Sequence, residues 1–353
     1  MGNRPSTILL CGFGAFGAVH AEAWRRALPD ARLTIADPSP AARRRAQALV
    51  PESDIAAEPE AFLADADIVD VVTPPDDHYA AVRMAIDAGK PAIVEKPAVR
   101  RLDHARDLAD RARAAGCPVQ VQFVLRAHPL VRRAAALLAQ GAIGRVVKVE
   151  GDFSGWKRMR ADSSLIENDG VHFLDLMSNL IGGPPVAADA RAHHHLGGPV
   201  ADEVDIDLGF PGEIAGHLRL GVLRAGTHDD PFVPGAVTTK RLRLIGDAGT
   251  IDLDFNAGRL FLARVRYEPT EDGWHPVPGD LVWEQPPAVT PVALLAETFT
   301  VFLAALDNGT PETGWPVLCN LSEGAVSMLE TMSAIETALT RQPAPMIEIR
   351  RPA

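Results

Sequence analysis

The sequence predicts an α/β protein with two domains. Residues 1–123 are expected to form a doubly wound parallel sheet, and residues 124–353 an α+β domain with a large, mostly antiparallel open sheet. Three observations predict this class. Short apolar runs alternate with helix-like segments in the first third of the chain, a glycine-rich turn follows the first run, and strand-like runs joined by short turns dominate later. At 353 residues the chain is also too long for one average domain.

The first domain repeats a strand followed by a helix. Strands are expected at 7–11, 33–37, 68–72, 92–94 and 119–123, and helices at 15–28, 79–88 and 105–115. Repeated units of this length are typical of a parallel sheet that binds its ligands at the carboxyl ends of the strands. We therefore expect functional residues directly after these strands.

The second domain begins with a helix and then becomes rich in strands. Helices are expected at 129–140, 172–181, 291–306 and 321–340, and strands at 146–153, 204–210, 214–223, 240–245, 250–255 and 259–265. The proline-rich stretch 276–291 is expected to be a loop interrupted by a short strand at 281–283. Short Gly, Pro and Asp turns between the strands favour antiparallel pairing.

A glycine fingerprint follows the first strand. It reads Gly12-Phe13-Gly14-Ala15-Phe16-Gly17, and Asp37 lies twenty residues beyond its last glycine, at the end of the second strand. In this pattern the first glycine permits a tight turn, the second lets the backbone approach a pyrophosphate, and the third lets the helix pack on the strand. The helix N-terminus then faces the phosphates. The sequence therefore predicts a dinucleotide site of the Rossmann type.

The acidic residue after the second strand favours NAD over NADP. The carboxylate of Asp37 can accept hydrogen bonds from both ribose hydroxyls and would repel a 2′-phosphate. Arg43, Arg44 and Arg45 follow on the next helix, and a cationic group there would suit a 2′-phosphate. We interpret these arginines as an ordinary solvated face of that helix.

Composition narrows the class of partner. Hydrophobic residues make up 47% of the chain, and no apolar run approaches the roughly twenty residues that span a membrane. A net charge of −11 argues against a nucleic-acid surface. The three cysteines are far apart, which suits a reducing cytoplasm, and His193-His194-His195 is unsuited to hold one metal ion because adjacent residues in an extended segment point to opposite sides. We expect a cytoplasmic protein without a bound metal, acting on small molecules.

A charged triplet, Glu95-Lys96-Pro97, ends the strand at 92–94, where a lysine could lie beside a nicotinamide. Together with the glycine fingerprint and other segments it resembles the Gfo/Idh/MocA oxidoreductase family, the glucose-fructose oxidoreductase and inositol dehydrogenase group, over essentially the whole chain. The other matching segments are Thr73-Pro74-Pro75 with His78, Ala88-Gly89-Lys90, Arg126 with Pro129, Gly170-Val171-His172 with Asp175, and the glycine-bearing turn at 244–250.

The resemblance implies hydride transfer between a nicotinamide and a secondary hydroxyl or ketone of a sugar, amino sugar or cyclitol, with Lys96 and His172 as the catalytic residues. Alcohol oxidation requires removal of the hydroxyl proton, and an amine and an imidazole are suitable acid–base groups. Glu95 would position Lys96, and the Lys96–Pro97 peptide bond would be cis. The residues expected to bind the cofactor are Gly12, Phe13, Gly14, Ala15, Phe16, Gly17, Asp37, Thr73, Pro74, Pro75, His78, Glu95, Lys96 and Gln122.

The resemblance also implies a substrate-binding set on the second domain. Its members are Arg126, Trp156, Lys157, Asn168, Asp169 and His172, with His128, Arg158 and Arg160 as further candidates. One position departs from the family pattern, because Asn168 stands where an aspartate is common, four residues before His172. Either Lys96 and His172 share the proton transfer or Asp169 substitutes for the missing carboxylate; we favour the former. Asp175, about one helical turn beyond His172, is expected to orient it.

Two other functions stay open at this point. One is a dinucleotide-binding sensor without catalytic activity, which the asparagine at position 168 would suit. The other is a glycosidase that uses NAD transiently and forms no net NADH. We also expect a homodimer or homotetramer, because a one-sided antiparallel sheet leaves an apolar face to cover and the resembling family commonly pairs such faces.

Overall fold

The computed structural model describes residues 7–159, 163–230, 233, 235–308 and 317–341. Its N-terminal part contains a six-stranded sheet in the order β3-β2-β1-β4-β5-β6, in which every pair is parallel. This is the strand order of a dinucleotide-binding fold and confirms the predicted fold class. The strands are β1 (Thr7–Cys11), β2 (Arg32–Ala36), β3 (Asp54–Ala56), β4 (Ile68–Val71), β5 (Ala92–Glu95) and β6 (Val119–Gln122).

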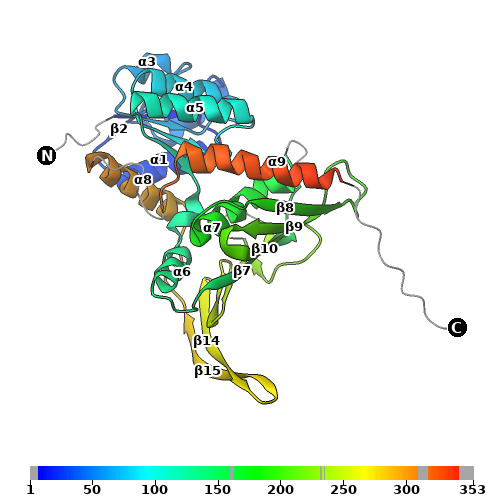
Figure 1. Cartoon of the computed structure of the whole chain (residues 1–353). Helices are drawn as coiled ribbons and strands as arrows, with labels where there is room; N and C mark the ends of the chain where they lie inside the picture. Colours follow the sequence, from blue (N-terminus) through cyan, green and yellow to red (C-terminus); the bar gives the residue numbers. More distant parts are fainter. Residues whose placement is uncertain (1–6, 160–162, 231–232, 234, 309–316, 342–353) are drawn as a thin grey trace.

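Helices cover this sheet and complete the expected alternation (Figure 1). The central strands read as continuous apolar runs because both faces of a parallel sheet are buried. The short elements β3 and α3 were not expected, since three or four residues carry too little periodicity to be recognised. The helices are α1 (Ala15–Ala27), α2 (Pro40–Leu49), α3 (Glu60–Leu63), α4 (His78–Asp87) and α5 (Leu102–Ala115).

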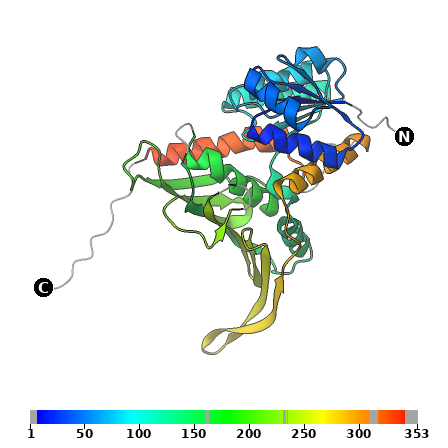
Figure 2. The same ribbon diagram turned by 180° about the vertical axis from the view of Figure 1, so that it is seen from behind.

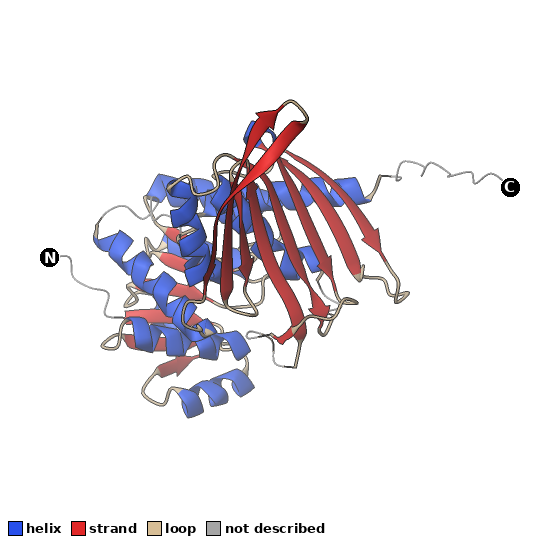
Figure 3. Ribbon diagram, turned by 90° about the horizontal axis from the view of Figure 1, so that it is seen from below, coloured by secondary structure: helices blue, strands red, loops and turns tan. Residues whose placement is uncertain are grey.

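The C-terminal part is built on a nine-stranded sheet in the order β15-β14-β13-β12-β7-β10-β9-β8, with β11 beside β12. Among the strand pairs of the described residues only β7 and β10 are parallel, so the sheet is mostly antiparallel, as predicted. Figure 3 shows these strands side by side with helices against one face. The strands are β7 (Val146–Trp156), β8 (Ala187–His193), β9 (Glu203–Phe210), β10 (Ile214–Gly221), β11 (His228–Asp229), β12 (Val237–Gly246), β13 (Gly249–Asp254), β14 (Arg259–Thr270) and β15 (Gly273–Glu284).

The proline-rich stretch 276–291 differs in part from the prediction. The expected strand at 281–283 and residues 285–290 of the expected loop are present, but residues 276–280 also belong to the twelve-residue strand β15, which forms with β14 the long hairpin that extends away from the other elements in Figure 1. Pro276 and Pro278 are tolerated because β15 is the edge of the sheet, where a missing N–H leaves no neighbouring strand unpaired. The prediction failed because prolines usually interrupt interior strands.

One C-terminal helix returns to the N-terminal part. Helix α8 (Pro291–Asp307) lies along α1, as Figure 2 shows, and the ring of Phe299 stacks on Trp24 with centroids 4.2 Å apart. A second link joins Gln122 of β6 to Thr298 through a hydrogen bond of 2.6 Å. The expected boundary at residue 123 stays a prediction, and α8 shows how closely the two parts are packed. The remaining α-helices of the described residues are α6 (Pro129–Ala139), α7 (Val171–Ile181) and α9 (Met328–Leu339), and short π-helical segments precede α7 and α9.

Candidate active site

The turn after β1 has the backbone that the fingerprint predicts. Gly12 has φ +96°, and a Cβ there would lie 2.7 Å from the carbonyl oxygen of Val72. A Cβ on Gly17 would lie 2.4 Å from the carbonyl oxygen of Gly12, so this glycine is needed for helix packing. Gly14 differs from both, because within the described residues no heavy atom beyond its own chain neighbours lies within 4 Å of its ideal Cβ position. The backbone of Gly14 is therefore accessible on the side from which a pyrophosphate would approach.

The first turn of α1 is free of side-chain caps. Gly14 is the N-cap residue and supplies no capping hydrogen bond, and the first turn carries no acidic residue. The exposed ring of Phe16 lies on this turn as well. Free backbone N–H groups at a helix N-terminus attract anions. The donor set therefore fits the pyrophosphate of a dinucleotide.

Asp37 is buried just after β2 and its carboxylate is held by the backbone. One oxygen accepts a hydrogen bond of 2.7 Å from the N–H of Phe13, and the other accepts one of 2.8 Å from Ser39. The carboxylate thus ties the glycine turn to the end of β2. Each carboxylate oxygen keeps a further lone pair with which it can accept a hydroxyl hydrogen bond.

Two of the three arginines on α2 bind backbone carbonyls. Arg43 donates to the carbonyl oxygens of Asp37 and Pro38 at 2.8 Å each, and Arg45 donates to that of Phe13. They are therefore more than the solvated face that the sequence predicted. Arg43 thus binds the loop after β2, at Asp37 and Pro38, and Arg45 binds the glycine turn at Phe13.

The buried side chain of His78 links the segment after β4 to the segment after β5. The two ring nitrogens of His78 lie 2.7 Å from the carbonyl oxygen of Thr73 and 2.9 Å from that of Pro97. This side chain was expected at the cofactor and the structure places it beneath these two loops. Pro74 is exposed and Pro75 half-buried on the same loop, and the buried Thr73 Oγ1 has no hydrogen-bond partner in the described part of the chain.

Lys96 follows β5 and reaches toward the second domain. The Lys96–Pro97 bond is cis, as the resemblance implied. The lysine Nζ donates a hydrogen bond of 3.0 Å to the carbonyl oxygen of Asn168, and its backbone N–H donates one of 3.1 Å to Glu95 Oε2. The structure therefore joins Glu95-Lys96-Pro97 to the segment that leads into α7.

His172 lies in the first turn of α7, with its ring edge-on to Phe123 at a centroid distance of 6.4 Å. Burial lowers the pKa of His172 well below its ordinary value of 6.5, and the nearby charges of Lys96, Lys240 and Lys157 lower it further. Its Nδ1 is buried and has no hydrogen-bond partner within the described ranges. The imidazole is therefore neutral near pH 7 and able to accept a proton.

Asn168, which stands where an aspartate is common, is bound to Asp169, the residue that could substitute for that aspartate. Asn168 Nδ2 donates to Asp169 Oδ1 at 3.1 Å, and the other oxygen of Asp169 forms an ion pair of 2.5 Å with Lys157. The Lys157 ammonium also lies 4.1 Å from the centre of the Phe153 ring. Both oxygens of Asp169 are thus engaged, which favours Lys96 and His172 for proton transfer.

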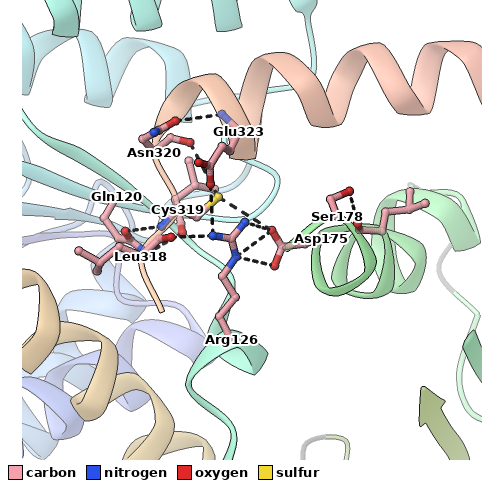
Figure 4. Close-up of polar contacts among 10 residues, drawn as sticks. Gln120, Arg126, Asp175, Ser178, Leu318, Cys319, Asn320 and Glu323 are labelled. Carbon is pink, nitrogen blue, oxygen red and sulfur yellow. Dashed lines mark hydrogen bonds and ion pairs between the residues drawn. The ribbon is translucent and has the colours of Figure 1, made fainter. Parts of the chain in front are cut away.

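Arg126 lies deeper than expected for a substrate contact. Its guanidinium is buried and forms an ion pair with Asp175 through hydrogen bonds of 2.6, 2.9 and 3.0 Å, while Nη1 donates to the carbonyl oxygen of Leu318 at 2.6 Å (Figure 4). The expected contact of Asp175 with His172 is wrong, because the acid faces Arg126 instead. A cavity of about 400 Å³ borders this pair between α7 and α9.

Four other predicted residues have clear positions. Trp156 is 60% exposed and its indole N–H donates to the carbonyl oxygen of Leu223. His128 is buried and its Nδ1 caps α6 by accepting from the N–H of Leu130. Gln122 Nε2 bonds to α8, as described above, and its Oε1 has no partner where residues are described. Arg158 is exposed, and Arg160 lies outside the described residues.

Two buried groups near the site were not predicted. His20 on α1 lies between two carboxylates, and Lys240 on β12 forms an ion pair of 2.8 Å with Asp230. The sequence signal for His20 is its position on the apolar face of α1, three residues after Gly17. Within the described residues, no group of three or more His, Cys, Asp and Glu side chains is placed to hold a metal ion, and no helix is long and apolar enough to cross a membrane.

Two family models match the chain. One, described as the oxidoreductase family with an NAD-binding Rossmann fold, matches residues 6–123, and the Gfo/Idh/MocA C-terminal domain matches residues 131–252. Together they span more than half of the sequence. The chain belongs to the Gfo/Idh/MocA oxidoreductase family. This confirms the family that the motifs indicated, and with it the predicted enzyme class of nicotinamide-dependent dehydrogenases.

This Gfo/Idh/MocA protein is similar to proteins of known and unknown activity. It is 27% identical to an uncharacterised protein of Sinorhizobium fredii, over 85% of this chain and 82% of that protein. It is 28% identical to inositol 2-dehydrogenase 2 of Saccharopolyspora erythraea, over 53% of this chain and only 57% of that enzyme. A levoglucosan dehydrogenase structure with NADH and levoglucosan has the same fold, with a TM-score of 0.76 at 19% identity, over 94% of this chain and 96% of that one.

Proposed function

We propose that the protein transfers a hydride between a nicotinamide cofactor and a secondary hydroxyl or ketone of a sugar, amino sugar or cyclitol. One observation carries the proposal. The hydrogen bond from Lys96 Nζ to the carbonyl oxygen of Asn168 joins the end of β5 to the segment that starts α7, where His172 lies. This contact supports a site at the carboxyl end of the parallel sheet that Lys96 and His172 share as the two proton-transfer groups.

The glycine turn and Asp37 would hold the cofactor. The open space at Gly14 and the uncapped N-terminus of α1 suit a pyrophosphate, and Asp37 suits the adenosine ribose. NAD is favoured over NADP, because the Asp37 carboxylate would repel a 2′-phosphate and Arg43 and Arg45 are already bound to carbonyl oxygens. When bound, the nicotinamide supplies the hydride acceptor or donor.

His172 would accept the hydroxyl proton while Lys96 holds the substrate oxygen. The lowered pKa of His172 keeps its imidazole unprotonated near pH 7, as a general base requires. The Lys96 ammonium would donate a hydrogen bond to the oxygen on which negative charge develops. Asn168 has no proton-accepting group in its side chain, and Asp169 is engaged by Lys157 and Asn168. In the reverse direction, the same two residues return the proton to the reduced ketone.

The proposed substrate class is inferred from the substrates for which the relatives are named. Enzymes named for inositol and levoglucosan share the family or the fold, and both compounds are polyhydroxylated rings. Asn168 accepts a hydrogen bond from Lys96 and Lys157 pairs with the adjacent Asp169, which supports a role for both in hydrogen-bonding such a ring. Neither alternative function, the sensor or the redox-neutral glycosidase, is favoured by these relatives. Assembly into a homodimer or homotetramer stays a prediction, and sizing chromatography would test it. The cytoplasmic location also stays a prediction.

The test is NADH formation when the purified protein and NAD are offered inositols, free sugars, amino sugars and nucleotide sugars, with Lys96→Ala measured in parallel. We expect turnover on at least one member and a loss of about 100-fold or more in the variant. NADH binding without turnover on any member would contradict the proposal in favour of a sensor. Cleavage of a glycoside with no net NADH would support the glycosidase instead.

A further inference from the structure

A histidine lies between two carboxylates at the centre of the N-terminal part. The Nδ1 atom of His20, on α1, is 2.8 Å from Asp70 Oδ2 on β4, and its Nε2 atom is 3.1 Å from Glu95 Oε1 on β5. The side chains of His20 and Asp70 are fully buried, and that of Glu95 is 13% exposed. One imidazole therefore links two neighbouring strands through a helix that packs on them.

Each ring nitrogen of His20 lies within hydrogen-bonding distance of a carboxylate oxygen, an arrangement that suits a ring protonated on both nitrogens. Ionised carboxylates only accept hydrogen bonds, and an imidazole donates from both nitrogens only when protonated. Burial by itself would lower the pKa of His20, but the charges and hydrogen bonds of Asp70 and Glu95 outweigh it and raise the pKa to about 10. The ring is thus an imidazolium near pH 7, with a carboxylate on each side.

Neighbouring side chains fix each end of this arrangement. The indole N–H of Trp24 donates to the same Asp70 oxygen at 2.7 Å, which holds that carboxylate in place. The His20 ring contacts Phe16 and Phe299, each with centroids 5.5 Å apart. The imidazolium therefore has little room to rotate away from Glu95.

Glu95 connects this arrangement to the catalytic segment. Its Oε1 atom accepts from His20, and its Oε2 atom accepts from the backbone N–H of Lys96. A continuous chain of hydrogen bonds thus runs from Asp70 through His20 and Glu95 to the backbone of Lys96. Removing the contact with His20 would release one oxygen of Glu95 and leave only the weaker local bond to hold the carboxylate.

We propose that His20 is a positioning residue for Lys96, acting through Glu95. The inference rests on the proposed function only in taking Lys96 as a catalytic residue. A purely structural role explains the arrangement less well. Burying three ionisable groups carries a desolvation penalty, and the electrostatic attraction between such groups often does not exceed that penalty. The value of the contact then lies in the geometry that it imposes on Glu95 and on the backbone of Lys96.

Two variants separate positioning from packing. His20→Gln can place its amide N–H near the position of Nε2 and keep the bond to Glu95, while His20→Asn can place an amide near the position of Nδ1 and keep only the bond to Asp70. We expect kcat to fall at least about tenfold further in His20→Asn than in His20→Gln, because small displacements of a catalytic group are costly. KM for NAD and the affinity for NADH should change less than twofold in both.

Thermal unfolding of both variants provides the comparison with stability. A structural role predicts that activity falls in step with the unfolding temperature. If His20→Asn and His20→Gln lose equal activity, or if activity follows stability alone, the proposal is wrong. Adding Glu95→Gln to His20→Asn should cause little further loss of kcat, since the two changes break the same connection.

A second measurement is independent of turnover. Lys96 is partly exposed, so its rate of reductive methylation can be read by peptide mass spectrometry in the whole protein, with Lys148, whose side chain is 43% exposed, as internal standard. We expect His20→Asn to change the labelling rate of Lys96 at least about threefold relative to Lys148, and His20→Gln to leave it near the wild-type value. An unchanged rate in both variants would overturn the positioning role. A changed rate with no turnover in the wild type would instead contradict the proposed function alone.

Discussion

The buried pair of Arg126 and Asp175 gives the sharpest prediction about stability. Both side chains are at most 4% exposed, and the guanidinium makes three hydrogen bonds to the carboxylate. Asp175→Ala leaves the positive charge buried, with the Leu318 carbonyl at 2.6 Å and Glu323 at 3.3 Å as its remaining partners. We expect the free energy of unfolding, measured by urea titration with circular dichroism, to fall by about 3–5 kcal/mol.

Two further variants decide whether the lost ion pair is the cause. Asp175→Asn keeps one acceptor oxygen and should cost less than the alanine variant. The double variant Arg126→Met with Asp175→Leu removes both charges and should recover part of the lost stability, since well-packed apolar pairs often replace buried ion pairs. A loss below about 1 kcal/mol for Asp175→Ala, or no recovery in the double variant, would refute the reasoning. A raised KM at unchanged stability in Arg126→Met would instead support the substrate contact predicted from the sequence.

Two other predictions concern the glycine turn and the cap of α6. Gly14→Ala should leave stability unchanged, because no heavy atom of the described residues beyond its own chain neighbours lies within 4 Å of its Cβ position, yet weaken NADH binding at least about tenfold by calorimetry. Gly17→Ala, with a Cβ 2.4 Å from a carbonyl oxygen, should cost about 1–3 kcal/mol of stability; equal stability in both variants would contradict this account. Burial lowers the pKa of His128 from 6.5 to about 4 in the folded protein. The contribution of the neutral imidazole to the free energy of unfolding is therefore complete above pH 6.5, and it is lost as the pH falls toward 4. His128→Asn, which keeps an acceptor for the N–H of Leu130, should reduce the loss of stability over that range by up to about 3 kcal/mol, and an unchanged slope in urea titrations would argue against it.

Local sequence patterns predicted most of the fold because each depends on a few neighbouring residues. The strand at Thr7–Cys11 and the helix from Ala15 were predicted from an apolar run and three glycines, and their bounds agree with the structure to within a residue. Only 281–283 of strand β15 was predicted, because the sequence shows its prolines but not that the strand is the edge of the sheet. Edge position is a property of the whole sheet, which no local pattern contains.

The sequence by itself determined the family, the dinucleotide turn and the positions of Lys96 and His172 along the chain. Those features depend on residue type and spacing, which fix local backbone geometry and chemistry. Only the tertiary structure decided which charges meet: Asp175 binds Arg126 rather than serving His172, and His20 binds Glu95 across seventy-five residues. The partner of a buried charge is set by where distant segments pack, because a charge removed from water is stabilised by whichever opposite charge the fold brings within hydrogen-bonding distance.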